Sequence, residues 1–167
     1  THNWQGSMKG ASCFAERMIE LQKDYATRLL THRNPYTGLR YVDDPAIAVV
    51  ETTNENSVFY FFRRSDLSLP YYRDALTRRW NDWLRAKYGS RDGLAKTWSP
   101  DSSRPVLKSE EDLVQGNVAL PFGMLSRLGP ALEGKTDEPL LDAARVSDML
   151  RFFAELHHPT DILAGFA

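Results

Sequence analysis

The stretch AIAVVETTNENS, residues 46–57, decides the fold class that the sequence predicts. Its first half is a short, almost continuous apolar run with two adjacent valines, and a long helical pattern precedes it. Such a run is typical of a strand that is covered on both faces in a parallel sheet. Asn54 and Glu55 would then stand at the carboxyl end of this strand, where α/β proteins place their chemistry. The sequence therefore predicts an α/β fold, with an amide donor at Asn54 and a proton donor or acceptor at Glu55.

Three helical patterns surround the predicted strand. The first covers residues 14–31, where apolar residues recur at steps of three and four. The second covers residues 69–89, with Pro70 suited to the first helical position and Gly89 suited to the C-terminal cap. The third covers residues 140–157 and shows the same periodicity. The predicted order is therefore helix, strand, helix, an irregular stretch and a final helix.

Two of these helices carry apolar surfaces. The stripe of the first helix comprises Phe14, Met18, Leu21, Tyr25 and Leu29. The second helix contains Trp80 and Trp83, and Trp98 follows in a short helical turn. Tryptophans at helical spacing are more often core residues than exposed rings. A sugar-stacking platform is the alternative that the sequence leaves open.

Residues 99–139 interrupt the helical pattern with recurring prolines and glycines. A connection of this length is unusual inside a compact domain. It is either an insertion or a functional loop.

Composition excludes several classes of function. The chain has 167 residues, a formal net charge of −1 and a single cysteine, Cys13. This charge balance excludes electrostatic recruitment to nucleic acid or to an anionic membrane, and no apolar run reaches the roughly 18 residues of a membrane span. The lone cysteine excludes an internal disulfide framework and a cysteine-rich zinc site. We therefore expect no nucleic-acid partner and no membrane partner.

About half of the chain, residues 14–98, resembles the clan A glycoside hydrolases. The resemblance lies in TRLLTHRNPYTGLRYVDDPAIAVVETTNENS and in the following LPYYRDALTRRWNDWLRAKYG and LAKTW. It is closest to large bacterial barrel enzymes related to family 5 cellulases and to β-galactosidase-type enzymes. The extended pattern NPYTG…DDPAIAVVE..NEN gives the resemblance its specificity, because an Asn-Glu pair alone occurs by chance in most proteins.

The resemblance implies roles for three residues. In that clan the fourth barrel strand ends in Asn-Glu, which makes Glu55 the general acid/base of a retaining mechanism. Asn54 is then the neighbour that binds the sugar 2-hydroxyl. His2 would correspond to a substrate-binding histidine at the end of the third strand. The resemblance implies no cofactor and no metal.

The fold expected from the resemblance is a partial (β/α)8 TIM barrel, helix-rich, with an irregular insertion after the helix that follows the catalytic strand. Its segments would be a partial barrel at 1–98, the insertion or loop at 99–139, and a C-terminal helix and tail at 140–167. A full barrel takes about 250 residues. Because the chain also starts at Thr1 rather than at methionine, we expect a single domain that is a fragment of a longer protein.

The leading functional hypothesis is a fragment of a retaining glycoside hydrolase that cleaves β-linked poly- or oligosaccharides. Its partners would be the carbohydrate substrate and the remainder of the parent barrel. No later apolar strand ends in a nucleophilic glutamate, since Glu133 lies in the glycine- and proline-rich stretch and Glu155 in a helix. The isolated chain is therefore expected to be inactive. The alternative is a non-catalytic helical carbohydrate-binding or interaction module derived from such a barrel. Only the resemblance bears on localisation, and it favours an extracellular or periplasmic protein.

Overall fold

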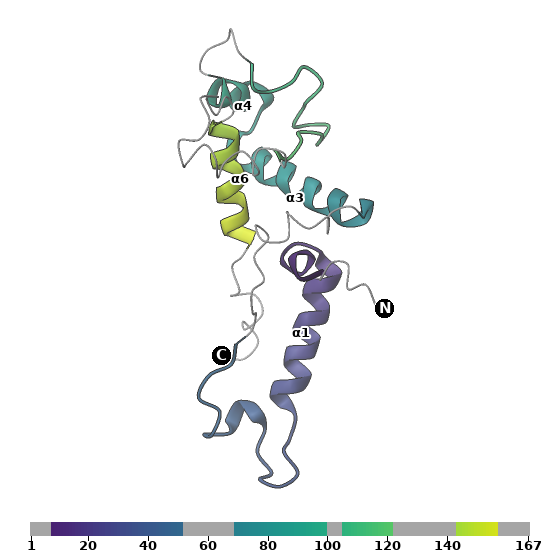
Figure 1. Cartoon of the computed structure of the whole chain (residues 1–167), viewed down its shortest axis with the longest axis vertical. Helices are drawn as coiled ribbons and strands as arrows, with labels where there is room; N and C mark the ends of the chain where they lie inside the picture. Colours follow the sequence, from purple (N-terminus) through teal and green to yellow (C-terminus); the bar gives the residue numbers. More distant parts are fainter. Residues whose placement is uncertain (1–7, 52–68, 100–104, 122–142, 157–167) are drawn as a thin grey trace, which may run out of the picture. The chain divides into compact units, whose positions relative to one another are not determined.

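The computed structural model of the chain describes residues 8–51, 69–99, 105–121 and 143–156 (Figure 1). These residues belong to two compact units. Unit 1 comprises Thr1–Asp66 together with His157–Ala167, and unit 2 comprises Leu67–Leu156.

In its described part, unit 1 contains one long helix, α1 (Glu16–Thr31), between two short 3-10 turns, η1 (Met8–Cys13) and η2 (Tyr41–Asp43). The helix confirms the pattern predicted over residues 14–31. At its C-terminus, the backbone N–H of His32 donates to the carbonyl of Leu29 and closes the last turn.

The apolar stripe of α1 is largely exposed. Phe14, at its N-terminal end, is buried, but Leu21, Tyr25 and Leu29 keep 44%, 69% and 43% of their surface exposed. A helix of a globular protein normally turns such a stripe toward the core. In unit 1 most of the apolar face of the helix therefore stays in contact with solvent.

The strand predicted over residues 46–53 is not formed in its described part, residues 46–51. Ile47, Val49 and Val50 are exposed, Val49 to 83%. The described residues contain no strand, only an isolated antiparallel bridge between Arg33 and Arg40. The prediction of an α/β fold and of a partial (β/α)8 barrel is therefore wrong for this structure. The physical reason is that an apolar run becomes a strand only when neighbouring strands pair with its backbone.

The described part of unit 2 contains three helices, α3 (Pro70–Tyr88), α4 (Arg91–Trp98) and α6 (Ala143–Leu156). Pro70 begins α3 as predicted, and Gly89 caps it with a φ of 69°, its N–H donating to the carbonyl of Arg85. Only two residues, Gly89 and Ser90, separate α3 from α4. Ser90 accepts the N–H of Gly93 on its hydroxyl and caps the second helix.

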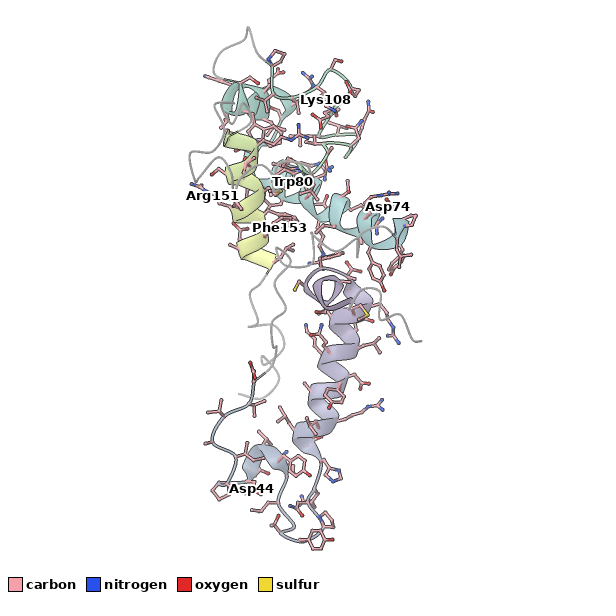
Figure 2. The ribbon with its side chains drawn as sticks, viewed as in Figure 1. Asp44, Asp74, Trp80, Lys108, Arg151 and Phe153 are labelled. Carbon is pink, nitrogen blue, oxygen red and sulfur yellow. The ribbon has the colours of Figure 1, made fainter. Side chains whose placement is uncertain are left out.

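The core of unit 2 is aromatic. The ring of Trp80 lies 5.7 Å from Trp83, 6.2 Å from Trp98 and 5.4 Å from Phe152, measured between centroids. Trp80 of α3 and Phe153 of α6, both labelled in Figure 2, are fully buried. Trp98 is also buried. The interpretation of Trp80 and Trp98 as core residues is therefore confirmed, and neither ring can serve as a sugar-stacking platform.

Residues 105–121 complete this core, although they form no helix or strand. Their buried side chains are Leu107, Glu111, Leu113, Val118 and Leu120. Asn81 of α3 holds the segment in place, because its amide both donates to the carbonyl of Val118 and accepts the N–H of Val118, at 3.0 Å each. This part of the stretch predicted as an insertion or loop is thus packed into unit 2.

No helix among the described residues is long and apolar enough to cross a membrane.

Replacement of Trp80 by alanine should lower the free energy of unfolding by about 3–5 kcal/mol, because it removes the ring at the centre of the aromatic core. The matched control is Tyr71→Ala on the same helix, where the ring is 62% exposed. That variant should stay within about 0.5 kcal/mol of the parent. Urea unfolding followed by circular dichroism measures both, and equal losses would contradict the assignment of Trp80 to the core.

Candidate functional site

The three residues predicted to form the active site, Asn54, Glu55 and His2, lie outside the described residues. Their predicted roles therefore remain predictions. The described stretch 8–51 ends at Glu51, three residues before Asn54. Glu51 itself is exposed.

The segment that leads to Asn54 and Glu55 begins with a closed turn. In this turn the side-chain oxygen of Asn34 accepts the N–H of Tyr36 at 2.9 Å, and the N–H of Gly38 donates to the Asn34 carbonyl at 2.8 Å. Gly38 has a φ of 72°, a conformation that favours glycine. The guanidinium of Arg33 donates to the Gly38 carbonyl at 2.5 Å. Asn34 and Gly38 of the NPYTG motif thus supply what this turn requires, a side-chain acceptor for a backbone N–H and a residue that adopts a positive φ.

A second turn follows at the two aspartates. Arg40 donates two hydrogen bonds to the carboxylate of Asp43, at 2.5 and 2.8 Å. The hydrogen bond from Arg40 lowers the pKa of Asp43, so this carboxylate stays ionised. Asp44 accepts the N–H of Ala46 at 2.9 Å and turns the chain into the apolar run. The described half of the pattern is therefore a pair of sequence-specific turns.

A retaining glycosidase needs a second carboxylate about 5–5.5 Å from its acid/base. Two carboxylates are buried in the described part of unit 2, Glu111 and Asp148, and sequence reasoning did not single them out. Their partners decide whether either one is available for chemistry.

Glu111 is fully engaged in holding the fold. Arg145 donates to both of its oxygens, at 3.0 and 2.5 Å, and the backbone N–H groups of Lys108 and Ala119 donate at 3.0 Å each. Burial acts to raise the pKa of Glu111, but the bonds from Arg145 and the two N–H groups outweigh it and hold the pKa below its ordinary value. A carboxylate with four donors is a structural anion, not a nucleophile.

Asp148 is saturated in the same way. Its carboxylate accepts from Lys87 Nζ at 2.5 Å, from Trp98 Nε1 at 2.8 Å and from the Tyr88 hydroxyl. Burial, followed by the hydrogen bond to Asp148, raises the pKa of Tyr88 well above its ordinary range. Tyr88 therefore stays protonated and acts as a donor to the carboxylate.

Glu155 also has a structural partner. It accepts the indole N–H of Trp83 at 2.5 Å and so joins α6 to α3. One face of Trp83 stacks on Trp80, and Lys87 Nζ lies 4.7 Å from the Trp83 centroid. These contacts of Trp83 are made with residues of unit 2, as are the ring contacts of the buried Trp80 and Trp98.

The sequence does contain a signal for the Asp148 cluster. Arg145, Asp148 and Phe152 follow one another at helical steps of three and four, so the two charged residues lie on the apolar face of α6. A charge on such a face predicts a buried partner.

Comparisons with known proteins found no match: no family model, no curated protein and no solved structure is similar to this chain. Among the described residues, no three His, Cys, Asp or Glu side chains group as a metal site would require.

The Glu111–Arg145 pair gives unit 2 a specific acid sensitivity. Because the folded-state pKa of Glu111 is lowered, its stabilising contribution is complete above the ordinary glutamate pKa of about 4.3 and is lost as the pH falls through the folded-state value. Glu111→Gln should cost about 3–5 kcal/mol at pH 7, since it leaves Arg145 buried without its counter-charge. It should also flatten the loss of stability between pH 5 and 3.

Glu110→Gln, at the exposed neighbouring position, is the matched control. Urea unfolding at a series of pH values compares the two variants. A Glu111→Gln protein with the stability and acid profile of Glu110→Gln would show that the buried pair does not stabilise unit 2.

Proposed function

We propose that the chain takes part in the hydrolysis of β-linked poly- or oligosaccharides by a retaining mechanism, with Glu55 as the general acid/base. The sequence pattern from Asn34 to Asn56 carries the proposal. The described half of this pattern supports it, because Asn34, Gly38 and Asp44 each have a defined role in the two turns that precede the Asn-Glu pair.

The mechanism assigns two successive tasks to Glu55. It first protonates the glycosidic oxygen as the bond to the leaving group breaks. After a sugar–enzyme intermediate has formed on a second carboxylate, the ionised Glu55 removes a proton from the incoming water. Asn54 would donate to the sugar 2-hydroxyl, and His2 would bind substrate beside it.

Three carboxylates of unit 2 are not available as the second carboxylate. Glu111 and Asp148 are both buried and occupied by donors, and Glu155 is bonded to Trp83. The proposal therefore assigns the nucleophile to a carboxylate other than these three.

Glu55→Gln in the catalytically competent protein tests the proposal. The substitution removes the transferable proton but keeps the shape of the side chain, so folding should barely change. Turnover of natural glycans should fall about 10²–10⁴-fold. Activated aryl glycosides should suffer least in the glycosylation step, because their leaving groups need little protonation. Added azide should restore turnover, since it attacks the intermediate without a general base.

Glu51→Gln is the internal control. Glu51 is an exposed carboxylate four residues earlier in the chain, and its replacement should leave activity unchanged. Loss of turnover in a folded Glu51→Gln protein, with natural-substrate activity intact in Glu55→Gln, would refute the assignment of the acid/base.

The second candidate function is a helical interaction module without catalysis. The exposed stripe of α1, formed by Leu21, Tyr25 and Leu29, favours it. We propose a second copy of the chain as the occupant, because the neighbouring charges are already paired within the helix, Arg17 with Glu20 and Arg28 with Asp24. Two such helices can approach without a large repulsion between like charges.

Tyr25→Glu tests this second candidate. Light scattering after size exclusion should show a self-associated parent chain and a shift toward the monomer in the variant, because the new carboxylate would have to be desolvated in the apolar contact. Lys23→Glu, an equally exposed position on the same helix, is the control and should leave the association unchanged. A parent chain that is monomeric at all accessible concentrations would exclude the module.

A further inference from the structure

Unit 2 contains an open cavity of about 330 Å³ beside α4. Its described lining residues are Arg91, Ala95, Lys96, Ser99, Pro105 and Leu107. None of its described lining residues is one that the glycosidase proposal uses.

The charge of the described lining is positive and uncompensated. Arg91 and Lys96 are its two charged residues, and the described lining has no carboxylate. Two cations elsewhere in unit 2 have carboxylate partners, Lys87 in Asp148 and Arg145 in Glu111. No such partner reaches Lys96 within the described residues.

Arg91 is held in a fixed orientation at the cavity. Its Nε donates to the Glu111 carbonyl at 3.0 Å, and its Nη2 donates to the Lys108 carbonyl at 3.3 Å. Among the described residues, the Nη1 group of this guanidinium makes no hydrogen bond, and it can donate to a ligand. A guanidinium that is oriented before binding loses little side-chain entropy when it meets an oxyanion.

The remaining wall combines one hydroxyl with apolar surface. The Ser99 Oγ accepts the N–H of Val106 at 2.7 Å, so its own proton can be donated to a ligand oxygen. Ala95, Pro105 and the buried Leu107 supply carbon surface. A lining that combines two cations with carbon surface fits a ligand that has an anionic head on a small organic body.

We propose that this cavity binds a small organic oxyanion, a phosphate or carboxylate group carried by a body of about the size of a hexose. Lys96 and Arg91 bind the oxyanion, Ser99 donates to one of its oxygens, and the body packs on the apolar wall. The cavity volume lies at the lower limit of about 300 Å³ that is usual for small-molecule sites. The proposal is independent of Glu55.

Calorimetric titration of the 167-residue chain tests the proposal with four probes: inorganic phosphate, hexose 6-phosphate, hexuronate and neutral hexose. We expect hexose 6-phosphate or hexuronate to bind, the better of the two identifying the head group. Inorganic phosphate should bind more weakly, and neutral hexose should not bind. Raised salt should weaken binding, because the contact is between charges.

Lys96→Gln should reduce the affinity about three- to tenfold without affecting the fold, since the side chain is exposed. Lys23→Gln makes the same chemical change at an exposed position of unit 1 and should leave the affinity unchanged. Ser99→Ala, a second variant in the cavity, should also weaken binding.

Two results would overturn the proposal: no binding of either organic anion at millimolar concentration, or binding that Lys96→Gln and Ser99→Ala leave intact. Binding of inorganic phosphate as tight as that of hexose 6-phosphate would refute the role of the apolar wall. Glu55→Gln should bind these probes as the parent does, so this test and that of the glycosidase proposal fail separately.

Discussion

The burial of the Asp148 carboxylate is the constraint on which unit 2 depends. A carboxylate among aromatic rings is stable only if its charge is matched and its oxygens receive hydrogen bonds. Lys87 and Tyr88 from the end of α3 and Trp98 from the end of α4 provide these partners. The three donors can converge only if α3 turns sharply into α4, which the Gly89–Ser90 connection achieves, so the helix connection and the polar cluster require each other.

The Glu111–Arg145 pair meets the same requirement for a buried carboxylate in the irregular segment 105–121, to which Glu111 belongs. This segment has no ladder of backbone bonds, and its polar groups are satisfied by side chains instead: Arg145 from α6, Arg91 from α4 and Asn81 from α3. Each of these side chains bonds to backbone carbonyls that would otherwise be buried without a donor. Unit 2 therefore forms one core from segments far apart in the sequence. The carboxylates that make this possible are, for the same reason, unavailable for catalysis.

Features that depend on residues close together in the sequence could be predicted, and features that depend on residues far apart could not. The helices at α1, α3 and α6 were predicted within three residues of their ends, because periodicity, Pro70 and Gly89 act locally. The strand was predicted wrongly, because the β-structure of an apolar run depends on partners that its own residues do not specify. The burial of Trp80 agrees with its place on the apolar face of the helix predicted over residues 69–89. The match of Asp148 with three donors was missed, since it joins residues 50 to 61 positions apart.

The two units differ in how much of their described apolar surface is buried, and this difference bears on function. In unit 2 the large apolar side chains of all three helices meet in one core. In unit 1 the stripe of α1 and the run at Ile47–Val50 remain exposed, and no backbone hydrogen bond links residues 48–51 to another described residue. An apolar helix face and an exposed apolar segment are both costly in water, and both gain stability when another surface covers them. Unit 1 thus presents described apolar surface that a partner can bury. Glu55 belongs to the same unit by its place in the sequence, so the two candidate functions concern the same unit.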